Sequence, residues 1–141
     1  MAEENLSQDP TRRRILLDTN AFLWAFQQPE TLEEAAREAI EDPETEVYVS
    51  SAVAWGIVIK HAKGNLPLPL APLEYVPARM KALGFTDLPI TQEHALAVSL
   101  LPAIHADPFD RITIAQAQVE GLTFVTRDAR VLTYSLKTLR A

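Results

Sequence analysis

The sequence predicts an α/β fold, a three-layer α/β/α sandwich with a mainly parallel sheet. Short apolar runs alternate along the chain with longer segments of helical pattern, which is the order expected when helices connect parallel strands. The first run, residues 15–17, contains only Ile and Leu, as is typical of a strand buried on both faces. With 141 residues, 48% of them hydrophobic, the chain is long enough to bury one core.

We expect a flexible N-terminal leader at residues 1–13 and a single domain at residues 14–141. The leader begins with acidic and polar residues, whereas a signal peptide begins with basic residues followed by an apolar stretch. The proline-rich segment 66–72 is read as a connector, because too little chain lies on either side of it for two cores. The lack of cysteine excludes disulfide frameworks and zinc ribbons and is compatible with the cytoplasmic location that we expect.

The first half of the chain is expected to hold a strand at residues 15–17, a helix at 21–26, a helix through 35–40, a strand at 46–50 and a helix at 52–63. The second of these helices would begin at a capping box, in which Thr31 and Glu34 satisfy free backbone N–H groups. Ser51 is expected to cap the third helix, and Gly64 to end it.

The second half is expected to hold a helix at residues 73–83, an edge strand at 87–90, helices at 93–101 and 109–120, a strand at 122–126 and a terminal strand within 131–139. Gly84 and Gly121 each stand just after a predicted helix, where a residue in the left-handed conformation commonly ends it. Thr91 is a candidate N-cap, and Pro77 is expected to distort the helix that contains it.

Three aspartates stand at the ends of predicted strands or at a helix start. Asp18 follows the first strand, Asp128 follows the strand at 122–126, and Asp110 begins the helix at 109–120. The carboxyl ends of parallel strands open into one crevice, so these carboxylates can meet there. Grouped carboxylates repel one another unless a cation neutralises them, which predicts a Mg²⁺ or Mn²⁺ site. Taken singly, each aspartate could equally form a turn or cap a helix.

Such a site suits the hydrolysis of a phosphodiester, because divalent ions activate water and stabilise charge on the attacked and leaving oxygens. The formal net charge of −6 is unusual for a nucleic-acid enzyme, which commonly has a basic face. A bound cation would offset part of the acidic charge, and basic residues gather locally at 12–14 and 60–63. Charge balance therefore neither supports nor excludes RNA as a substrate.

The chain resembles the PIN-domain family and, within it, the VapC-type toxins of bacterial toxin–antitoxin pairs. The segments that carry the resemblance are 16–24 (LLDTNAFLW), 47–57 (VYVSSAVAWGI), 88–95 (LPITQEHA), 105–117 (HADPFDRITIAQA) and 122–128 (LTFVTRD). Their joint order and spacing are more specific than any one of them. The resemblance implies a Mg²⁺- or Mn²⁺-dependent endoribonuclease, usually a homodimer, that is inhibited by a cognate antitoxin.

The resemblance also implies roles for individual residues. The first, third and fourth acids of the family fall on Asp18, Asp110 and Asp128, which would be catalytic and would hold the metal. Asp107 is an auxiliary acid in this interpretation. The neighbouring hydroxyl and amide groups that could orient the ligands are those of Thr19, Asn20 and Thr126.

The chain departs from the family pattern at Gly56. The second acid of the family is a glutamate that follows an aromatic residue, and here the segment reads Trp55-Gly56-Ile57. Glycine offers no ligand, so we expect this chain to bind metal weakly and to cleave RNA poorly. Three explanations stay open: the protein is naturally impaired, another group such as Asp107 supplies the ligand, or the residue was altered to make a toxic protein tolerable to its host.

Other residues and functions compete with this interpretation. Arg111 could contact RNA phosphate or hold an acid, or form a surface salt bridge. The three histidines, His61, His94 and His105, lack metal-ligand spacing and are not expected to bind metal. The rival functions are a catalytically disabled module that binds antitoxin or RNA without cleavage, and a phosphoacceptor receiver domain. A receiver domain expects paired acids after the first strand, where Asp18 stands alone.

Overall fold

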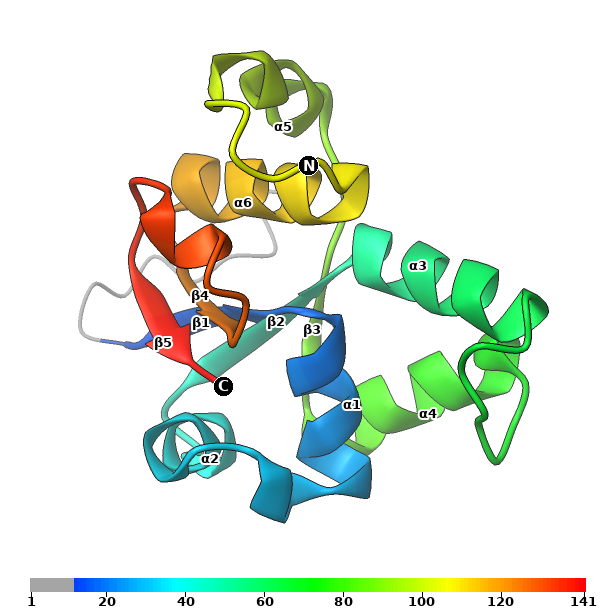
Figure 1. The fold of residues 1–141 in the computed structure, drawn as a ribbon. Helices are drawn as coiled ribbons and strands as arrows, with labels where there is room; N and C mark the ends of the chain where they lie inside the picture. Colours follow the sequence, from blue (N-terminus) through cyan, green and yellow to red (C-terminus); the bar gives the residue numbers. More distant parts are fainter. Residues whose placement is uncertain (1–11) are drawn as a thin grey trace.

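The computed structural model describes residues 12–141 (Figure 1). Its five strands form one sheet in the order β3-β2-β1-β4-β5, and every neighbouring pair is parallel. The strands are β1 (Arg14–Leu17), β2 (Glu46–Ser50), β3 (Thr86–Leu88), β4 (Thr123–Thr126) and β5 (Thr138–Arg140). The predicted three-layer α/β/α fold with a parallel sheet is confirmed. Residues 1–11 of the predicted leader lie outside the described residues.

Six α-helices connect the strands and cover both faces of the sheet (Figure 1). They are α1 (Thr19–Gln27), α2 (Glu34–Glu41), α3 (Ser51–Ala62), α4 (Pro72–Leu83), α5 (Gln92–Ala97) and α6 (Pro108–Glu120). Short 3₁₀ turns occupy Pro29–Thr31, Val98–Leu100 and Val131–Thr133. Within residues 12–141, none of these helices is long and apolar enough to cross a membrane.

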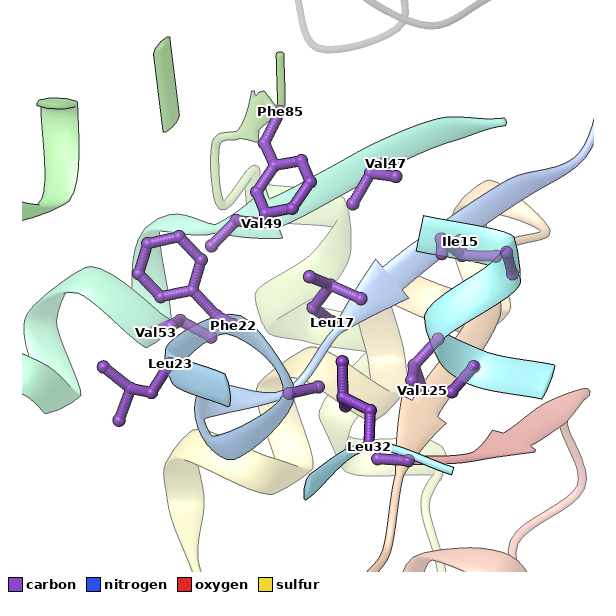
Figure 2. Packing of buried hydrophobic residues seen from close by; sticks show 14 of the residues in the cluster. Ile15, Leu17, Phe22, Leu23, Leu32, Val47, Val49, Val53, Phe85 and Val125 are labelled. Carbon is purple, nitrogen blue, oxygen red and sulfur yellow. The ribbon is translucent and has the colours of Figure 1, made fainter. Parts of the chain in front are cut away.

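Alternation along the strands divides the core into two layers. Ile15 and Leu17 pack on one face of the sheet, together with apolar residues of α1, α2, α3 and α4 (Figure 2). Leu16, which points to the other face, packs with Ile114 of α6 and Phe124 of β4. Strands buried on both faces need apolar residues at every position, which explains the uninterrupted run at the N-terminus of the domain.

The N-terminal caps of two helices differ from the predictions. The side chain of Ser50, not Ser51, caps α3 by accepting a hydrogen bond from the Ala52 N–H at 3.0 Å. Helix α2 starts later than its predicted capping box, with Glu33 at the cap position and no side-chain cap. Thr31 instead ends the preceding 3₁₀ turn, so the predicted capping box was wrong. The predicted cap of Thr91 is confirmed, since its hydroxyl accepts from the His94 N–H at 3.2 Å.

Helix α5 and the terminal strand are shorter than predicted. Helix α5 ends at Ala97 and gives way to a 3₁₀ turn, so the predicted helix at 93–101 was too long. The terminal strand is only β5, because Val131–Thr133 forms a 3₁₀ turn. The helix that contains Pro77 runs on to Leu83, and Gly84 ends it with a φ of +70°. Arg12 and Arg13, which the sequence placed in the leader, contact β2 and the turn before it, where the Arg13 carbonyl accepts from the Glu46 N–H at 2.8 Å.

Candidate metal centre

A pocket of about 260 Å³ opens where the C-terminal ends of β1 and β4 meet the N-terminus of α6. Its lining includes four aspartates, Asp18, Asp107, Asp110 and Asp128. Because β1 and β4 are neighbouring parallel strands, the residues that follow them emerge at the same edge of the sheet. The fold thus brings together three acids that lie up to 110 positions apart in the sequence, together with Asp107.

Asp18 is fixed by two hydrogen bonds at the end of β1. Its Oδ1 accepts from the Ala21 N–H at 2.8 Å, which makes it the N-cap of α1. Its Oδ2 accepts from the hydroxyl of Thr126 at 2.7 Å. Burial raises the pKa of the Asp18 carboxyl above its ordinary value, and these two hydrogen bonds only partly oppose the effect. A nearby cation would favour the ionised form of Asp18.

Thr126, at the end of β4, links two of the acids. While its hydroxyl donates to Asp18, the same oxygen accepts from the Asp128 N–H at 3.1 Å. The structure therefore places Thr126 where it orients Asp18 directly and Asp128 through its backbone. Thr19 and Asn20 also line the pocket. Within residues 12–141, no hydrogen bond joins either of their side chains to an acid of the cluster.

Asp128 forms a turn with Arg130 and stays ionised. Its Oδ1 accepts from the Arg130 N–H at 2.9 Å, and its Oδ2 lies 3.2 Å from the Arg130 guanidinium. Partial burial acts to raise the pKa of Asp128, but the hydrogen bonds from Arg130 and His105 outweigh it and lower that pKa to about 2. This carboxyl is a permanent negative charge in the pocket at neutral pH.

Asp110 lies in the first turn of α6, close after the N-cap Asp107. Asp107 caps the helix by accepting from the Phe109 N–H at 2.8 Å. Burial, followed by repulsion from Asp107, raises the pKa of the Asp110 carboxyl to about 6. His105 opposes this rise, whereas Asp18 and Asp128 add to it. The acids are thus close enough to disfavour one another's ionisation.

His105, which was not expected to take part in a metal site, lies at the centre of this cluster. Its Nε2 is 2.9 Å from Asp128 Oδ2 and 3.0 Å from Asp110 Oδ2, and the residue is only 3% exposed. Histidine spacing could not reveal it, because its partners are aspartates and one of them lies 23 residues away. The available signal was its place five residues before Asp110, in the loop that leads into α6.

The donor set fits a divalent cation that prefers oxygen ligands. Three ligand atoms, one each from His105, Asp110 and Asp128, lie within 4.8 Å of one another, and Asp18 lines the same pocket. Carboxylate oxygens suit Mg²⁺ or Mn²⁺, and the raised pKa of Asp110 marks charge that the protein alone does not neutralise. Gly56 of α3 lines the same pocket and contributes no side chain.

The Arg111 guanidinium bonds to backbone carbonyls of the segment 98–105. Its guanidinium donates to the carbonyl oxygen of Pro102 at 2.9 Å, and it lies within 3.4 Å of further backbone carbonyls at Val98, Leu101 and His105. This arrangement is none of the three roles considered from the sequence, which were a contact to RNA phosphate, a partner for an acid and a surface salt bridge. Arg111 instead fixes the segment that carries His105.

Replacing Arg111 with lysine should destabilise the fold while keeping the charge. The lysine ammonium cannot reproduce the planar fork that reaches several carbonyls, so buried acceptors lose partners. We expect a loss on the order of 1.5–3 kcal/mol in the free energy of unfolding, measured by urea denaturation. Arg140→Lys is the matched control, because that exposed arginine pairs with Glu33 at the surface. Equal stability of the two variants would contradict a structural role for Arg111.

Comparisons with known proteins identify the family and agree with the fold. The PIN domain family model matches residues 15–135. Ribonuclease VapC22 of Mycobacterium tuberculosis is 30% identical over 121 residues, which cover 83% of this chain and 88% of that protein. Among solved structures, VapBC2 from Rickettsia felis bound to a promoter DNA fragment superposes with a TM-score of 0.66 at 13% identity, covering 90% of this chain and 98% of that one. A toxin–antitoxin complex from Klebsiella pneumoniae gives a TM-score of 0.61 at 20% identity, covering 89% and 95%.

Proposed function

Because the chain belongs to the PIN domain family, we propose that it is a metal-dependent endoribonuclease and the toxin of a toxin–antitoxin pair. The observation that carries the proposal is the convergence of Asp18, Asp110 and Asp128 in one pocket, from the ends of two neighbouring strands and the start of a helix. The name of its relative, Ribonuclease VapC22, supports the same activity. The proposed enzyme has one domain at residues 14–141.

We assign the metal to Asp18, Asp110 and Asp128, with Asp107 as an auxiliary acid. Bound Mg²⁺ or Mn²⁺ would lower the pKa of a water molecule and neutralise charge on the scissile phosphate. The protein residues have separate tasks. Asp128 supplies a charge that is present at every physiological pH, and Thr126 and the N-terminus of α1 hold Asp18 in place. Burial and neighbouring acids raise the pKa of Asp110, so a cation would favour its ionised form.

Lys60 is the residue that we assign to the RNA phosphate. It lies one turn after Gly56 on α3, lines the pocket, and its charge lowers the pKa of Asp18. Arg127 lines the pocket as well, but its guanidinium donates to the carbonyl oxygens of Ala141 and Thr31 and stacks on Trp24. Of these two cations, Lys60 is the better placed to meet an incoming phosphate.

Lys60→Gln should weaken RNA binding more than it slows the cleavage of bound RNA. RNA affinity decreases with salt, and we expect the magnitude of the slope of log affinity against log salt concentration to decrease by about 0.7. This is the value for one phosphate contact on a single strand. Lys63→Gln removes the same charge at the C-terminus of α3, away from the pocket lining, and should leave the slope unchanged. Filter binding across a salt series measures both. Equal slopes for the two variants would remove Lys60 from the phosphate contact.

The proposed activity is tested by incubating the purified chain with structured RNA in Mn²⁺, Mg²⁺ or EDTA. Asp18→Asn is the inactive control: its amide oxygen can still cap α1, whereas its NH₂ group replaces the oxygen that accepts from Thr126. Cleavage that requires the metal and disappears in this control supports the nuclease. RNA binding without cleavage under every condition favours the second candidate, a disabled PIN-like module. Gly56 is the observation that favours that candidate.

We further propose a cognate antitoxin as partner, a homodimer as the assembled state and the cytoplasm as location. The antitoxin is supported by the similar structure from Klebsiella pneumoniae, which is a toxin–antitoxin complex. Sedimentation of the purified chain measures the assembled state, and a monomer at micromolar concentration would contradict a homodimer. Co-purification with the product of a neighbouring gene tests the antitoxin.

A further inference from the structure

The ring of His105 has hydrogen-bond partners on both nitrogens, and one of them fixes where the proton lies. Its Nδ1 is 3.1 Å from the backbone nitrogen of Asp107. A backbone N–H can only donate, so Nδ1 must accept and carries no proton. The ring proton of the neutral imidazole therefore lies on Nε2.

The protonated Nε2 faces two carboxylates at once. It lies 3.0 Å from Asp110 Oδ2 and 2.9 Å from Asp128 Oδ2, so it donates to both. In this tautomer Nε2 has no lone pair to offer a metal ion, although its position beside two acids resembles that of a ligand. We propose that His105 is a positioning residue that gathers Asp110 and Asp128 by donating to both, and that it does not bind the metal. The proposal rests on the proposed metal-dependent function.

The backbone of His105 is held by contacts that do not involve the carboxylates. The His105 N–H donates to the hydroxyl of Tyr134 at 2.8 Å, and that hydroxyl donates to the Pro102 carbonyl at 3.0 Å. Arg111 lies 3.4 Å from the His105 carbonyl and from the same tyrosine oxygen. These contacts fix the backbone of His105 and the Asp107 N–H holds its ring, so the side chain is positioned without a cation.

The shared donor reduces the repulsion between the two carboxylates. Asp110 and Asp128 raise one another's energy when both are ionised, and a shared N–H offsets part of that repulsion. Ligating carboxylates commonly need such partners, whose loss lowers metal affinity or activity about 10- to 100-fold. Without His105 the two carboxylates would separate, so a cation would have to bring them together again.

The tautomer is measured directly by ¹⁵N NMR of the full chain labelled at histidine. We expect His105 to show a protonated Nε2 and an unprotonated Nδ1, both without metal and at saturating Mg²⁺, which is diamagnetic. The signals of His105 are identified by their absence from the spectrum of the His105→Gln variant. His94 is an internal reference outside the site, because its Nδ1 accepts from the Thr91 N–H at 3.0 Å and its Nε2 meets Glu120 at 2.7 Å. A protonated Nδ1 on His105, or a change to that form when Mg²⁺ binds, would overturn the proposal.

Two variants separate positioning from ligation and from misfolding. His105→Ala should lower Mg²⁺ affinity, followed by backbone amide shifts, about 10- to 100-fold. His105→Gln should recover part of the affinity, because its amide N–H can still donate. Equal Mg²⁺ affinity for the alanine variant and the unaltered chain would overturn the role of His105. If Mg²⁺ shifts no amide near Asp18 in the unaltered chain, the proposed metal function fails, while the donor geometry is still decided by the metal-free spectrum.

Discussion

Gly56→Glu should raise metal-dependent RNA cleavage by this chain about 10- to 100-fold, the range over which one partner of a metal site changes affinity or activity. The sequence resemblance implies that Gly56 occupies the position of the family's second acid, and in the fold this residue lines the same pocket as Asp18 and Asp110. A side chain fits there. The nearest atom to an added Cβ is Phe109 Cδ1 at 3.9 Å, and the backbone of Gly56 does not have a positive φ.

Two control variants isolate the carboxylate from the other effects of filling this position. Gly56→Ala should raise the free energy of unfolding by about 0.5–1 kcal/mol, because glycine weakens a helix interior, and it should not raise cleavage. Gly56→Gln matches the glutamate variant in size and lacks the charge. Equal activation by the glutamine and glutamate variants would show that packing of α3, not a ligand, limits the enzyme. No gain with glutamate would mean that the site is impaired for other reasons.

Thermal unfolding gives the same prediction a second readout that does not depend on substrate. Without metal, a further acid in the pocket should lower the Tm of the Gly56→Glu variant below that of the Gly56→Gln variant, because it adds to the repulsion that helps to raise the pKa of Asp110. Saturating Mg²⁺ should then raise its Tm more than it raises that of the unaltered chain, since tighter binding stabilises the folded state further. The same Mg²⁺ shift in both proteins would place the introduced carboxylate outside the metal site.

The order of elements was predictable because each buried strand needs an uninterrupted apolar run. Residues 15–17 and 47–49 carried that signal, and two glycines with positive φ, Gly84 and Gly121, marked the ends of α4 and α6. The exact cap of α3 was not predictable. Ser50 and Ser51 are adjacent and both can cap a helix, and the choice depends on where β2 stops.

Residues of the candidate site were predictable only where they directly follow a strand or begin a helix. Asp18 and Asp128 could be placed because each follows a strand, and strands of one parallel sheet end at the same edge. His105 lies in a loop without a periodic pattern, and its partnership with Asp128 exists only after α6 packs on the sheet. The role of Arg111 depends likewise on a loop that curls around its guanidinium, which no residue spacing encodes.

Asp110→Asn should abolish metal-dependent cleavage and yet stabilise the metal-free protein at neutral pH. The pKa of Asp110 is about 6 in the folded chain, above its ordinary value of 3.8, so the folded state favours the protonated form. For a carboxyl shifted in this direction, the stability contribution is fully present below about pH 4 and is lost as pH rises through about 6. At pH 7.5 Asp110 is almost fully ionised, which lowers the free energy of unfolding of the unaltered protein. Asparagine carries no charge and avoids this loss.

The expected gain is on the order of 1 kcal/mol after screening by solvent, since the Asp110 side chain is 33% exposed, and the Tm should rise by several degrees. Differential scanning at pH 7.5 and pH 5 checks this, because the gain should shrink at the lower pH. Asp42→Asn is the matched control outside the pocket, where the side chain accepts from the Glu44 N–H. If Asp110→Asn lowers the Tm at pH 7.5, His105 and its neighbours already satisfy the Asp110 charge. Protein groups would then already neutralise much of the charge of the four aspartates, which would weaken the case for a bound cation.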